Sequence, residues 1–441
     1  MASTYLSRTP ASAGSTQTGT FSAWVKKSSN ATTNRLFSGF INSADFTNIF
    51  FRSVNDELTI SSQGSASIDI KSAMDFRDNN GFYHIVVAFD LSNGTASNRV
   101  KVYVNGNQLT DFDSSTYPSS SDTINFNKTS ATAMIGHQEG TYFNGIMSHI
   151  HWIDGTVYDA SAFGETDATT GIWKPKTAPS VTYGTNGFFL KFENSGAFGT
   201  DSSGNGNNFT VNGTMTQTID TPSNVFATLN PLVGLGSLTL SNGNLTCGNT
   251  TTAWDTISST IGASSGKWYS EYKWDSTSGG FIMNGIISID TTIDNINSDF
   301  YIGQFSTGYG YYSDNGSSYN NGSASAYGNS YTVGDIIGIA MDLDNSKLYF
   351  SKNGTWQNSG DPTSGATGTG AISITSGLTY AFGASNRNSA VQSINYGNGY
   401  FGTTAVSSAE NPDDGIGIFE YDVPTGYRAL CTKSINAEEY D

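Results

Sequence analysis

Charged side chains are scarce in this sequence of 441 residues, and basic side chains are the scarcest. Lysine and arginine number 20 against 37 aspartates and glutamates, so the formal net charge is −17 at pH 7. A surface of that sign repels nucleic-acid phosphates and anionic lipid headgroups. We therefore expect no nucleic-acid partner and no binding to a membrane surface.

Long apolar runs and prolines are also few. No stretch approaches the roughly 18 apolar residues of a membrane-spanning helix, so membrane insertion is not expected. The first fifteen residues lack the apolar middle of a signal peptide, so export by that route is not expected either. Nine prolines and 13% aromatic residues do not fit a disordered chain. The length is that of a globular protein with two or three domains.

The two cysteines, Cys247 and Cys431, lie far apart in the sequence, and neither has a neighbour that would complete a zinc or redox pair. Two buried, reduced thiols explain them. A disulfide that joins the two ends of the second domain is the alternative, and geometry decides between the two.

Short runs of β-branched and aromatic residues alternate with Asn-Gly steps along the whole chain. Asn-Gly supplies the positive φ angles that tight hairpin turns need. In VKVYV (100–104) the valines occupy every second position, which is the period of a strand. Apolar residues at helical spacing are missing over long stretches, so we predict an all-β fold.

One pattern occurs twice. An apolar strand ends in FDLSN (89–93) and leads to a second strand, VYVNG (102–106); much later, MDLDN (341–345) leads to LYFSKNG (348–354). Each copy predicts a hairpin that is followed by an Asn-Gly turn. The repeat indicates two sandwich domains of related build.

The fold class that follows is two antiparallel β-sandwich (jelly-roll) domains in tandem with a short C-terminal β tail. Prolines 222 and 231 cannot lie in central strands, and the glycines and serines after them suit a connector. We place the first domain at residues 1–225, a linker at 226–243, the second domain at 244–403 and the tail at 404–441.

The first domain carries a set of motifs in a fixed order. They are YLSRT (5–9), TFSAWVK (20–26), FNGI (143–146), WIDG (152–155), FGE (163–165), GTNGF (184–188) and DSSGNGNNF (201–209). Through them, this part resembles a concanavalin A-like or laminin-G-like jelly roll of a version frequent in tailed bacteriophages. The last motif opens such domains elsewhere, so the resemblance implies a circularly permuted sandwich. Residues 186–212 should then pair in the same sandwich as residues 20–26.

The second domain resembles a SPRY domain, a bent β-sandwich used for recognition. The matching motifs are GKWYSE (266–271), GDIIGIAMD (334–342), LYFSKNG (348–354) and NYG (395–397), and the tail segment PTGYRALCT (424–432) is similar to endings of phage structural proteins. The resemblance implies a phage virion component that is assembled in the host bacterial cytoplasm.

Catalysis finds little support in the residue pattern. Glycan hydrolysis needs two carboxylates about 5 to 10 Å apart across the sugar bond. Glu271 and Asp275 share a strand face but lie ~13 Å apart at the rise of a strand, and Glu420 and Asp422 fall in the tail. We therefore expect a protein that is not an enzyme, and a glycan hydrolase is the least favoured alternative.

Two segments are candidates for metal binding. His149 and His151 lie on one face of a strand, but an ordinary polar face explains them too. Asp201, Asn205 and Asn207 alternate with glycine and serine, as oxygen ligands of Ca²⁺ do. The same residues also cap turns without any ion, so Ca²⁺ is a possible cofactor and a plain turn is the alternative.

The strongest recognition signal is the tyrosine-rich segment 301–331. Tyrosine with glycine, serine and asparagine is the mixture of antibody paratopes, and sugars stack their C–H faces on such rings. The alternative is that these are ordinary strand residues. The predicted ligand-binding residues are Tyr309, Tyr311, Tyr312, Tyr319, Trp254 and Trp356.

The function expected from these observations is a virion protein of the short tail fibre, tip module or capsid appendage type. Its partners would be other virion subunits and a host cell-surface glycan or protein, bound by loops of the sandwiches. A homo-oligomer is expected, and a trimer is one option. The rival is a purely structural capsid-decoration or tail-assembly protein that contacts neighbouring subunits.

Overall fold

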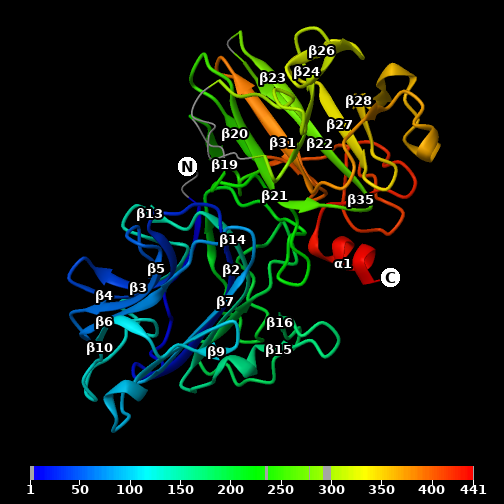
Figure 1. Cartoon of the computed structure of the whole chain (residues 1–441). Helices are drawn as coiled ribbons and strands as arrows, with labels where there is room; N and C mark the ends of the chain where they lie inside the picture. Colours follow the sequence, from blue (N-terminus) through cyan, green and yellow to red (C-terminus); the bar gives the residue numbers. More distant parts are fainter. Residues whose placement is uncertain (1–3, 234–236, 278, 292–298, 441) are drawn as a thin grey trace. The chain divides into compact units, whose positions relative to one another are not determined.

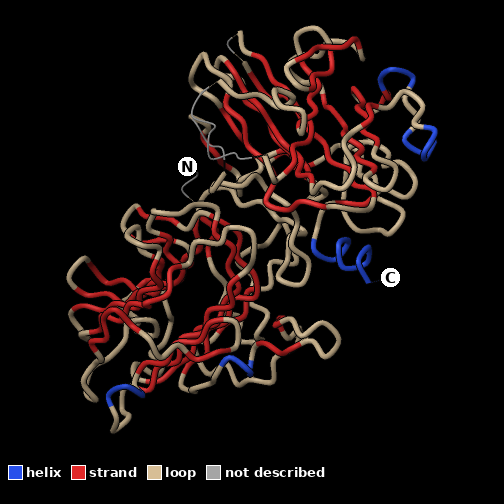
Figure 2. Tube along the Cα trace, viewed as in Figure 1, coloured by secondary structure: helices blue, strands red, loops and turns tan. Residues whose placement is uncertain are grey.

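The computed structural model describes residues 4–233, 237–277, 279–291 and 299–440, and it divides the chain into two compact units, Met1–Gln217 and Thr218–Asp441. Strands are the main regular element of both units, and helices are few (Figures 1 and 2). The prediction of an all-β protein with two antiparallel sandwiches is confirmed. Among the described residues, none of the helices has the length and apolar character needed to cross a membrane.

Unit 1 consists of two antiparallel sheets and two small hairpins. The larger sheet runs β10 (Phe112–Thr116), β6 (Ile68–Asp75), β5 (Glu57–Gln63), β4 (Asp45–Phe51), β3 (Asn34–Asn42), β11 (Thr132–Ile135), β1 (Tyr5–Arg8), β18 (Thr210–Asn212). The smaller sheet runs β17 (Phe188–Leu190), β14 (Gly145–Asp154), β2 (Thr18–Lys27), β7 (Tyr83–Asp90), β8 (Val100–Val104), β9 (Asn107–Gln108). The hairpins are β12 (His137–Gln138) with β13 (Thr141–Tyr142) and β15 (Gly164–Thr166) with β16 (Trp173–Pro175).

The last strands of unit 1 close against its first ones. β18 pairs with β1, where Val211 faces Leu6, and β17 pairs with β14, which in turn pairs with β2. Residues 186–212 therefore belong to the same sandwich as residues 20–26, as predicted. The first and the last strands of unit 1 thus share one core.

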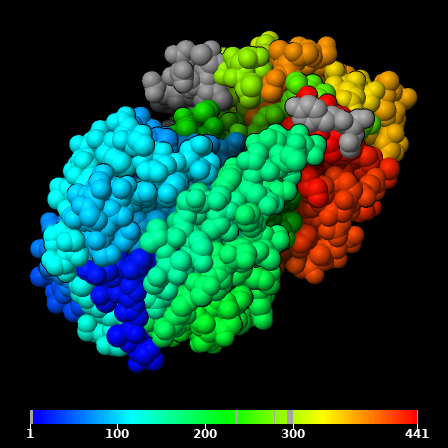
Figure 3. All heavy atoms as spheres, turned by 90° about the horizontal axis from the view of Figure 1, so that it is seen from below, coloured from blue at the N-terminus to red at the C-terminus, as the bar shows by residue number. Residues whose placement is uncertain are grey.

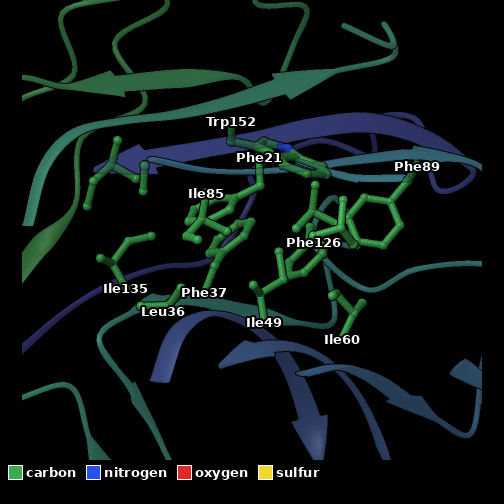
Figure 4. Packing of buried hydrophobic residues seen from close by; sticks show 14 of the residues in the cluster. Phe21, Leu36, Phe37, Ile49, Ile60, Ile85, Phe89, Phe126, Ile135 and Trp152 are labelled. Atoms are coloured by element: carbon green, nitrogen blue, oxygen red, sulfur yellow. The ribbon is translucent and has the colours of Figure 1, made fainter. Parts of the chain in front are cut away.

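Aromatic side chains fill the core of unit 1. Phe21 and Trp152 from the smaller sheet meet Phe37 from the larger one, and Phe126 stacks on Phe37 with ring centroids 4.2 Å apart (Figure 4). All four side chains are buried. Removal of this apolar surface from water is the main source of the unit's stability.

The outer face of the smaller sheet is also covered. The segment that follows β14 returns over this face, where Phe163 and Ala160 pack on Val86 and Ile153. This segment forms a continuous part of the surface in the space-filling view, where it is blue-green (Figure 3). The sheet is therefore buried on both faces in this region, which brings polar side chains such as His84 under cover.

Unit 2 also contains two main sheets. One runs β19 (Thr239–Ser241), β20 (Thr246–Gly248), β32 (Val391–Asn395), β22 (Lys267–Ser276), β27 (Ile336–Asp342), β28 (Lys347–Lys352), β29 (Thr355–Trp356), with β30 (Ile372–Ser373) on β28 and β35 (Arg428–Ala429) on β22. The other runs β21 (Asp255–Ala263), β31 (Tyr380–Arg387), β23 (Phe281–Ser288), β24 (Gly308–Tyr312), β25 (Ser317–Asn320), β26 (Ser323–Ala326). β33 (Tyr400–Phe401) pairs with β34 (Thr404–Ala405), and α1 (Thr432–Tyr440) ends the unit.

The repeated sequence pattern forms the same hairpin in each unit. β7 pairs with β8, and β27 pairs with β28. In the turns, Asn93 donates from its amide to Asp90 at 3.0 Å, and Asn345 donates to Asp342 at 2.9 Å. The asparagine of each following Asn-Gly step has a positive φ and accepts the backbone N–H at the start of the first strand, at 2.8 Å in both units. The predicted pair of related hairpins is confirmed.

The boundaries of the second unit differ from the expected ones. Unit 2 begins at Thr218 and contains both the expected linker 226–243, of which residues 234–236 lie outside the described residues, and the expected tail 404–441. Phe226 is buried and bridges to Cys431, while Phe419 and Tyr427 pack on Tyr269 of β22. The expected linker and the expected tail pair with the rest of unit 2 through isolated bridges and short strands. The prolines and glycines of residues 226–243 therefore do not mark a separate linker. The tail ends in a helix rather than in strands.

Candidate functional site

The tyrosine-rich segment supplies both the core and the surface of unit 2. Along β24, Tyr309 and Tyr311 point between the sheets and are 5% and 0% exposed. Tyr311 stacks on Phe350 at 5.2 Å between ring centroids, and its hydroxyl donates to the carbonyl of Asn329. This position corrects the prediction of ligand contact for Tyr309 and Tyr311, because strand alternation turns both rings inward.

Four other aromatic rings lie together on the outer face of the same sheet. Tyr312 points away from the core, and the ring centroids of Tyr312 and Trp254, Tyr312 and Tyr319, and Tyr319 and Tyr301 lie 5.7, 5.7 and 5.9 Å apart. Tyr301 and Trp254 close the circuit at 6.0 Å. Such spacings are typical of favourable edge-to-face contacts. We call Trp254, Tyr301, Tyr312 and Tyr319 the aromatic patch; its three tyrosines are partly exposed, and Trp254 is buried beneath them.

Two further side chains extend the aromatic patch. The guanidinium of Arg387 lies 6.0 Å from the ring centroid of Trp254 and donates from Nε to the carbonyl of Thr252. The ring of Phe281 lies 5.8 Å from that of Tyr312. Burial raises the pKa of Tyr312 to about 12, so its phenol stays protonated near neutral pH and can donate a hydrogen bond.

The aromatic patch rests on a firmly held loop. Ile302 is buried and donates its backbone N–H to the hydroxyl of Ser385, while Thr256 donates to the carbonyl of Phe300. A Cβ atom at Gly383 would lie 2.7 Å from Cδ1 of Ile302, so the side chain of Ile302 packs closely on β31 at this glycine. Residues 300–302, which include Tyr301, are therefore fixed on the sheet, and the patch is organised before any ligand arrives.

A hollow of about 320 Å³ adjoins the aromatic patch through Phe281. Its lining combines aromatic rings, hydroxyl groups and one charge of each sign: Trp274, Phe281, Ser313, Asp314, Ser330, Tyr331, Thr332 and Lys352. Lys352 pairs with Asp335 at 3.1 Å, whereas Asp314 is exposed. Rings for stacking beside carboxylate and hydroxyl groups are what a sugar or a polar peptide surface requires.

Trp356 does not belong to this site. It lies on β29 of the other sheet, where its ring packs against Tyr269 at 6.4 Å and Tyr349 at 6.5 Å. The prediction that Trp254 and Trp356 border one surface is therefore corrected. The pairing of β29 with β28 carries Trp356 away from the aromatic patch.

The carboxylate of Glu271 serves the fold. Glu271 is fully buried on β22 and accepts hydrogen bonds from the backbone N–H groups of Glu420 and Tyr421 at 2.8 and 2.9 Å. Asn395 and Tyr269 donate to it as well, at 3.2 and 3.3 Å. Burial raises the pKa of Glu271 to about 7 despite these donors. Its oxygens hold the C-terminal segment in place and do not face an open groove.

Asp201, Asn205 and Asn207 are engaged in hydrogen bonds within unit 1. The carboxylate of Asp201 accepts the N–H groups of Phe189, Ser203 and Asn207 and the hydroxyl of Ser203, which occupies its four lone-pair directions. Asn205 donates to backbone carbonyls, and Asn207 accepts from Arg8. This geometry favours the plain turn over Ca²⁺. Among the described residues, no three His, Cys, Asp or Glu side chains are grouped to hold a metal ion.

The His149–His151 pair does not keep strand alternation. The register of β14 against β2 shifts between Ser148 and His151, and His149 has a φ of +48°. His151 is buried, stacks on Phe189 and shares a hydrogen bond of 2.9 Å with the hydroxyl of Tyr183. Because of this bulge, His149 and His151 do not lie side by side on one strand face. His151 belongs to the covered outer face of the smaller sheet.

The two cysteines are free and buried. Cys247 contacts the amide oxygen of Asn386 at 3.6 Å, and Cys431 contacts the hydroxyl of Ser434 at 3.2 Å. The interpretation as two reduced thiols is confirmed, and the alternative of a disulfide is not. Burial raises the pKa of the Cys247 thiol, which makes it a poor nucleophile.

Two family models match the chain. Residues 2–161 match the concanavalin A-like lectin/glucanases superfamily, and residues 267–397 match the SPRY domain. The chain contains a concanavalin A-like domain and a SPRY domain. The first match lies in unit 1 and the second in unit 2. The hollow and the three tyrosines of the aromatic patch lie within the SPRY match, and Trp254 precedes it.

Solved structures resemble part of the chain at low identity. The SPRY domain of human HERC1 shares 15% identity at a TM-score of 0.30 and covers 38% of this chain and 96% of its own. The TRIM65 PSpry domain shares 13% identity at a TM-score of 0.31, and the match covers 38% of this chain and 88% of that domain. Stonustoxin shares 17% identity at a TM-score of 0.27, and the match covers 37% of this chain and 26% of the stonustoxin chain. Comparison with curated proteins finds no match.

Sequence reasoning missed Tyr301 and Arg387 as members of the site. Tyr301 is the first residue of the tyrosine-rich segment. Its contact with Trp254 could not be predicted, because the two residues lie far apart in the sequence. Arg387 is the last residue of β31, among Asn and Ser residues, and its sole signal is that basic residues are rare in this domain. Both reach the patch only through the pairing of β31 with β21 and β23.

Proposed function

We propose that this chain is a non-enzymatic component of a tailed-bacteriophage virion that recognises a host-surface glycan or protein through its SPRY domain. It would be a short tail fibre, a tip module or a capsid appendage, assembled in the host cytoplasm with other virion subunits. The resemblance of the first domain to a version frequent in tailed bacteriophages, and of the tail motif to endings of phage structural proteins, supports the virion part. The proposal for recognition rests on one observation, the partly exposed aromatic patch beside a hydroxyl-lined hollow.

The chemistry of the patch suits reversible binding. Rings already packed against one another lose little conformational freedom when a ligand stacks on them, and tyrosine hydroxyls remain available as donors. Asp314 and Arg387 add an acceptor and a donor near Tyr312. A weak single site is sufficient, because many copies on one particle raise the apparent affinity through avidity.

Binding of the purified chain to host cells and to an array of bacterial surface polysaccharides tests the proposal. We expect Tyr312→Ala and Tyr319→Ala to weaken binding about tenfold each, the loss of roughly 1.4 kcal/mol of stacking. Trp356→Ala is the matched control, since it removes an aromatic ring outside the patch, and it should bind like the unmodified chain.

Two results would count against recognition by the patch. Equal binding by all three variants would place the binding elsewhere. No binding at all, together with particle images in which neighbouring subunits bury the patch, would favour the structural role in capsid decoration or tail assembly.

A further inference from the structure

Lys27 and Asp56 form an ion pair that is sealed from water inside the concanavalin A-like domain. Nζ of Lys27 lies 2.6 Å from Oδ1 of Asp56, and the side chains are 0% and 5% exposed. Lys27 ends β2 in one sheet, and Asp56 lies in the turn between β4 and β5 of the other. By contrast, the pair Lys71–Asp69 has nearly the same length, 2.7 Å, but lies at the surface.

Aromatic rings and backbone groups surround the pair. The ring centroid of Phe51 lies 5.1 Å from Nζ, and Phe51 and Phe76 are both fully buried. The carbonyl of Phe76 accepts a hydrogen bond from Nζ at 2.7 Å. The backbone N–H of Ala31 donates to both carboxylate oxygens of Asp56, at 3.0 and 3.1 Å.

Burial of both side chains makes two separate charges costly at this place. Two charges removed from water lose their hydration, and transfer of one proton from Nζ to the carboxylate removes both charges at once. Burial also lowers the pKa of Lys27. Nζ of Lys27 and the carboxylate of Asp56 are held in direct contact. Such fixed contact gives effective concentrations of about 10⁵ M or more.

We propose that Lys27 and Asp56 condense into an intramolecular isopeptide bond. After the proton transfer, Nζ attacks Cγ of Asp56, and the N–H of Ala31 stabilises the negative oxygen that forms. The Cγ–O bond to the protonated oxygen then breaks, and that oxygen leaves as water. Both hydrogens of the water come from Nζ, which keeps one. The reaction needs no other reactant.

The bond would join the two sheets of this domain covalently. Both cysteines of the chain lie in unit 2, so within residues 1–217 no disulfide can take that role. A covalent link between β2 and the β4–β5 turn would hold the sandwich closed when the chain is pulled or heated, because the two sheets could not separate at that point.

The intact mass of the full-length, denatured protein tests the proposal. We expect a mass one water lower than the sequence requires, and a protease digest in which the peptide containing Lys27 stays joined to the peptide containing Asp56. Lys27→Met should restore the full mass of its own sequence, and Lys71→Met should keep the loss of water. Asp56→Asn should lose ammonia instead and give the same cross-linked product.

The unmodified chain decides the matter even if a variant fails to fold. Folded protein that carries the full sequence mass and is cleaved after Lys27 by trypsin would overturn the proposal. Loss of water mapped to peptides other than those with Lys27 and Asp56 would overturn it as well.

Discussion

The two domains build similar sandwiches from different aromatic residues. Residues 1–217 contain 18 phenylalanines and 7 tyrosines, whereas residues 218–441 contain 8 phenylalanines and 16 tyrosines. A buried phenylalanine asks only for apolar neighbours, but a buried tyrosine also needs a hydrogen-bond partner. The SPRY core accordingly contains hydroxyl contacts such as Tyr331 to the carbonyl of Tyr311 at 2.7 Å. A tyrosine-rich sequence can therefore describe a core as well as a binding surface.

The domains also differ in the groups that titrate inside them. Residues 1–217 hold 13 basic and 17 acidic side chains and all four histidines, whereas residues 218–441 hold 7 basic and 20 acidic side chains. The first domain buries neutral histidines, and the second buries the carboxylate Glu271. Acid should therefore affect the two domains in opposite directions through these groups.

The largest expected effect concerns His84. Its ring lies on Trp24 at 4.6 Å, accepts the indole N–H of Trp173 at 3.0 Å, and has its pKa lowered by burial from 6.5 to about 3. The folded state thus binds the proton less well than the unfolded state. The contribution of neutral His84 to the free energy of unfolding is therefore present above pH 6.5. It is lost as the pH falls towards 3, by up to about 5 kcal/mol.

Hydrogen exchange of the slowest amides in each domain, followed from pH 7 to pH 4, measures this loss. In His84→Gln the part of the pH slope that belongs to the first domain should shrink, and the SPRY domain should keep its own profile. An unchanged slope in the first domain would show that His84 is protonated without cost and that burial does not set its titration.

Glu271 should give a smaller effect of opposite sign. Its pKa is raised from 4.5 to about 7, so the folded SPRY domain binds this proton better than the unfolded chain does. The contribution of protonated Glu271 to the free energy of unfolding is fully present below pH 4.5. It is lost as the pH rises through 7, by about 3 kcal/mol. Glu271→Gln should abolish this slope, and exchange of the amides of Glu420 and Tyr421 reads it out locally. A flat profile in the unmodified domain would contradict the assignment.

The sequence alone predicted the class of fold and much of its arrangement. Strand alternation and Asn-Gly turns are local signals, and so the paired hairpins at residues 83–104 and 336–352 were predictable. The limits of unit 2 were not, because Phe226 and Phe419 are held by long-range contacts that leave no local periodicity. Pro222, Pro231 and Gly243 lie in turns of a segment that docks on the domain.

The candidate site was predicted only in part, for a related reason. Composition pointed to the right segment, but the face on which each tyrosine lies depends on where β24 begins. A start at Gly308 sends Tyr309 and Tyr311 inward and leaves Tyr312 outside. The sequence shows that residues 309–312 (Tyr-Gly-Tyr-Tyr) alternate between two faces of a strand. It does not show which face packs on the core, because the packing partners come from distant parts of the chain. Trp356 was misplaced because strand order within the sandwich is not encoded locally.

The smallest expected effect separates the two roles of tyrosine within one segment. Tyr327 is buried, and its hydroxyl accepts the backbone N–H of Phe350 at 3.1 Å. Tyr327→Phe leaves that N–H without its side-chain acceptor and should destabilise the SPRY domain by about 1 to 2 kcal/mol, with ligand binding unchanged. Tyr312→Phe removes a partly exposed hydroxyl and should cost less than about 0.5 kcal/mol.

Thermal denaturation and ligand binding of both variants give the comparison. The structural reading requires that stability falls for Tyr327→Phe and not for Tyr312→Phe, while any change in affinity is confined to Tyr312→Phe. If both substitutions lowered stability equally, the division of the segment into core and patch would fail. If Tyr327→Phe weakened binding at unchanged stability, the binding surface would have to include a ring that the sandwich encloses, and the hollow rather than the outer face would become the place to search.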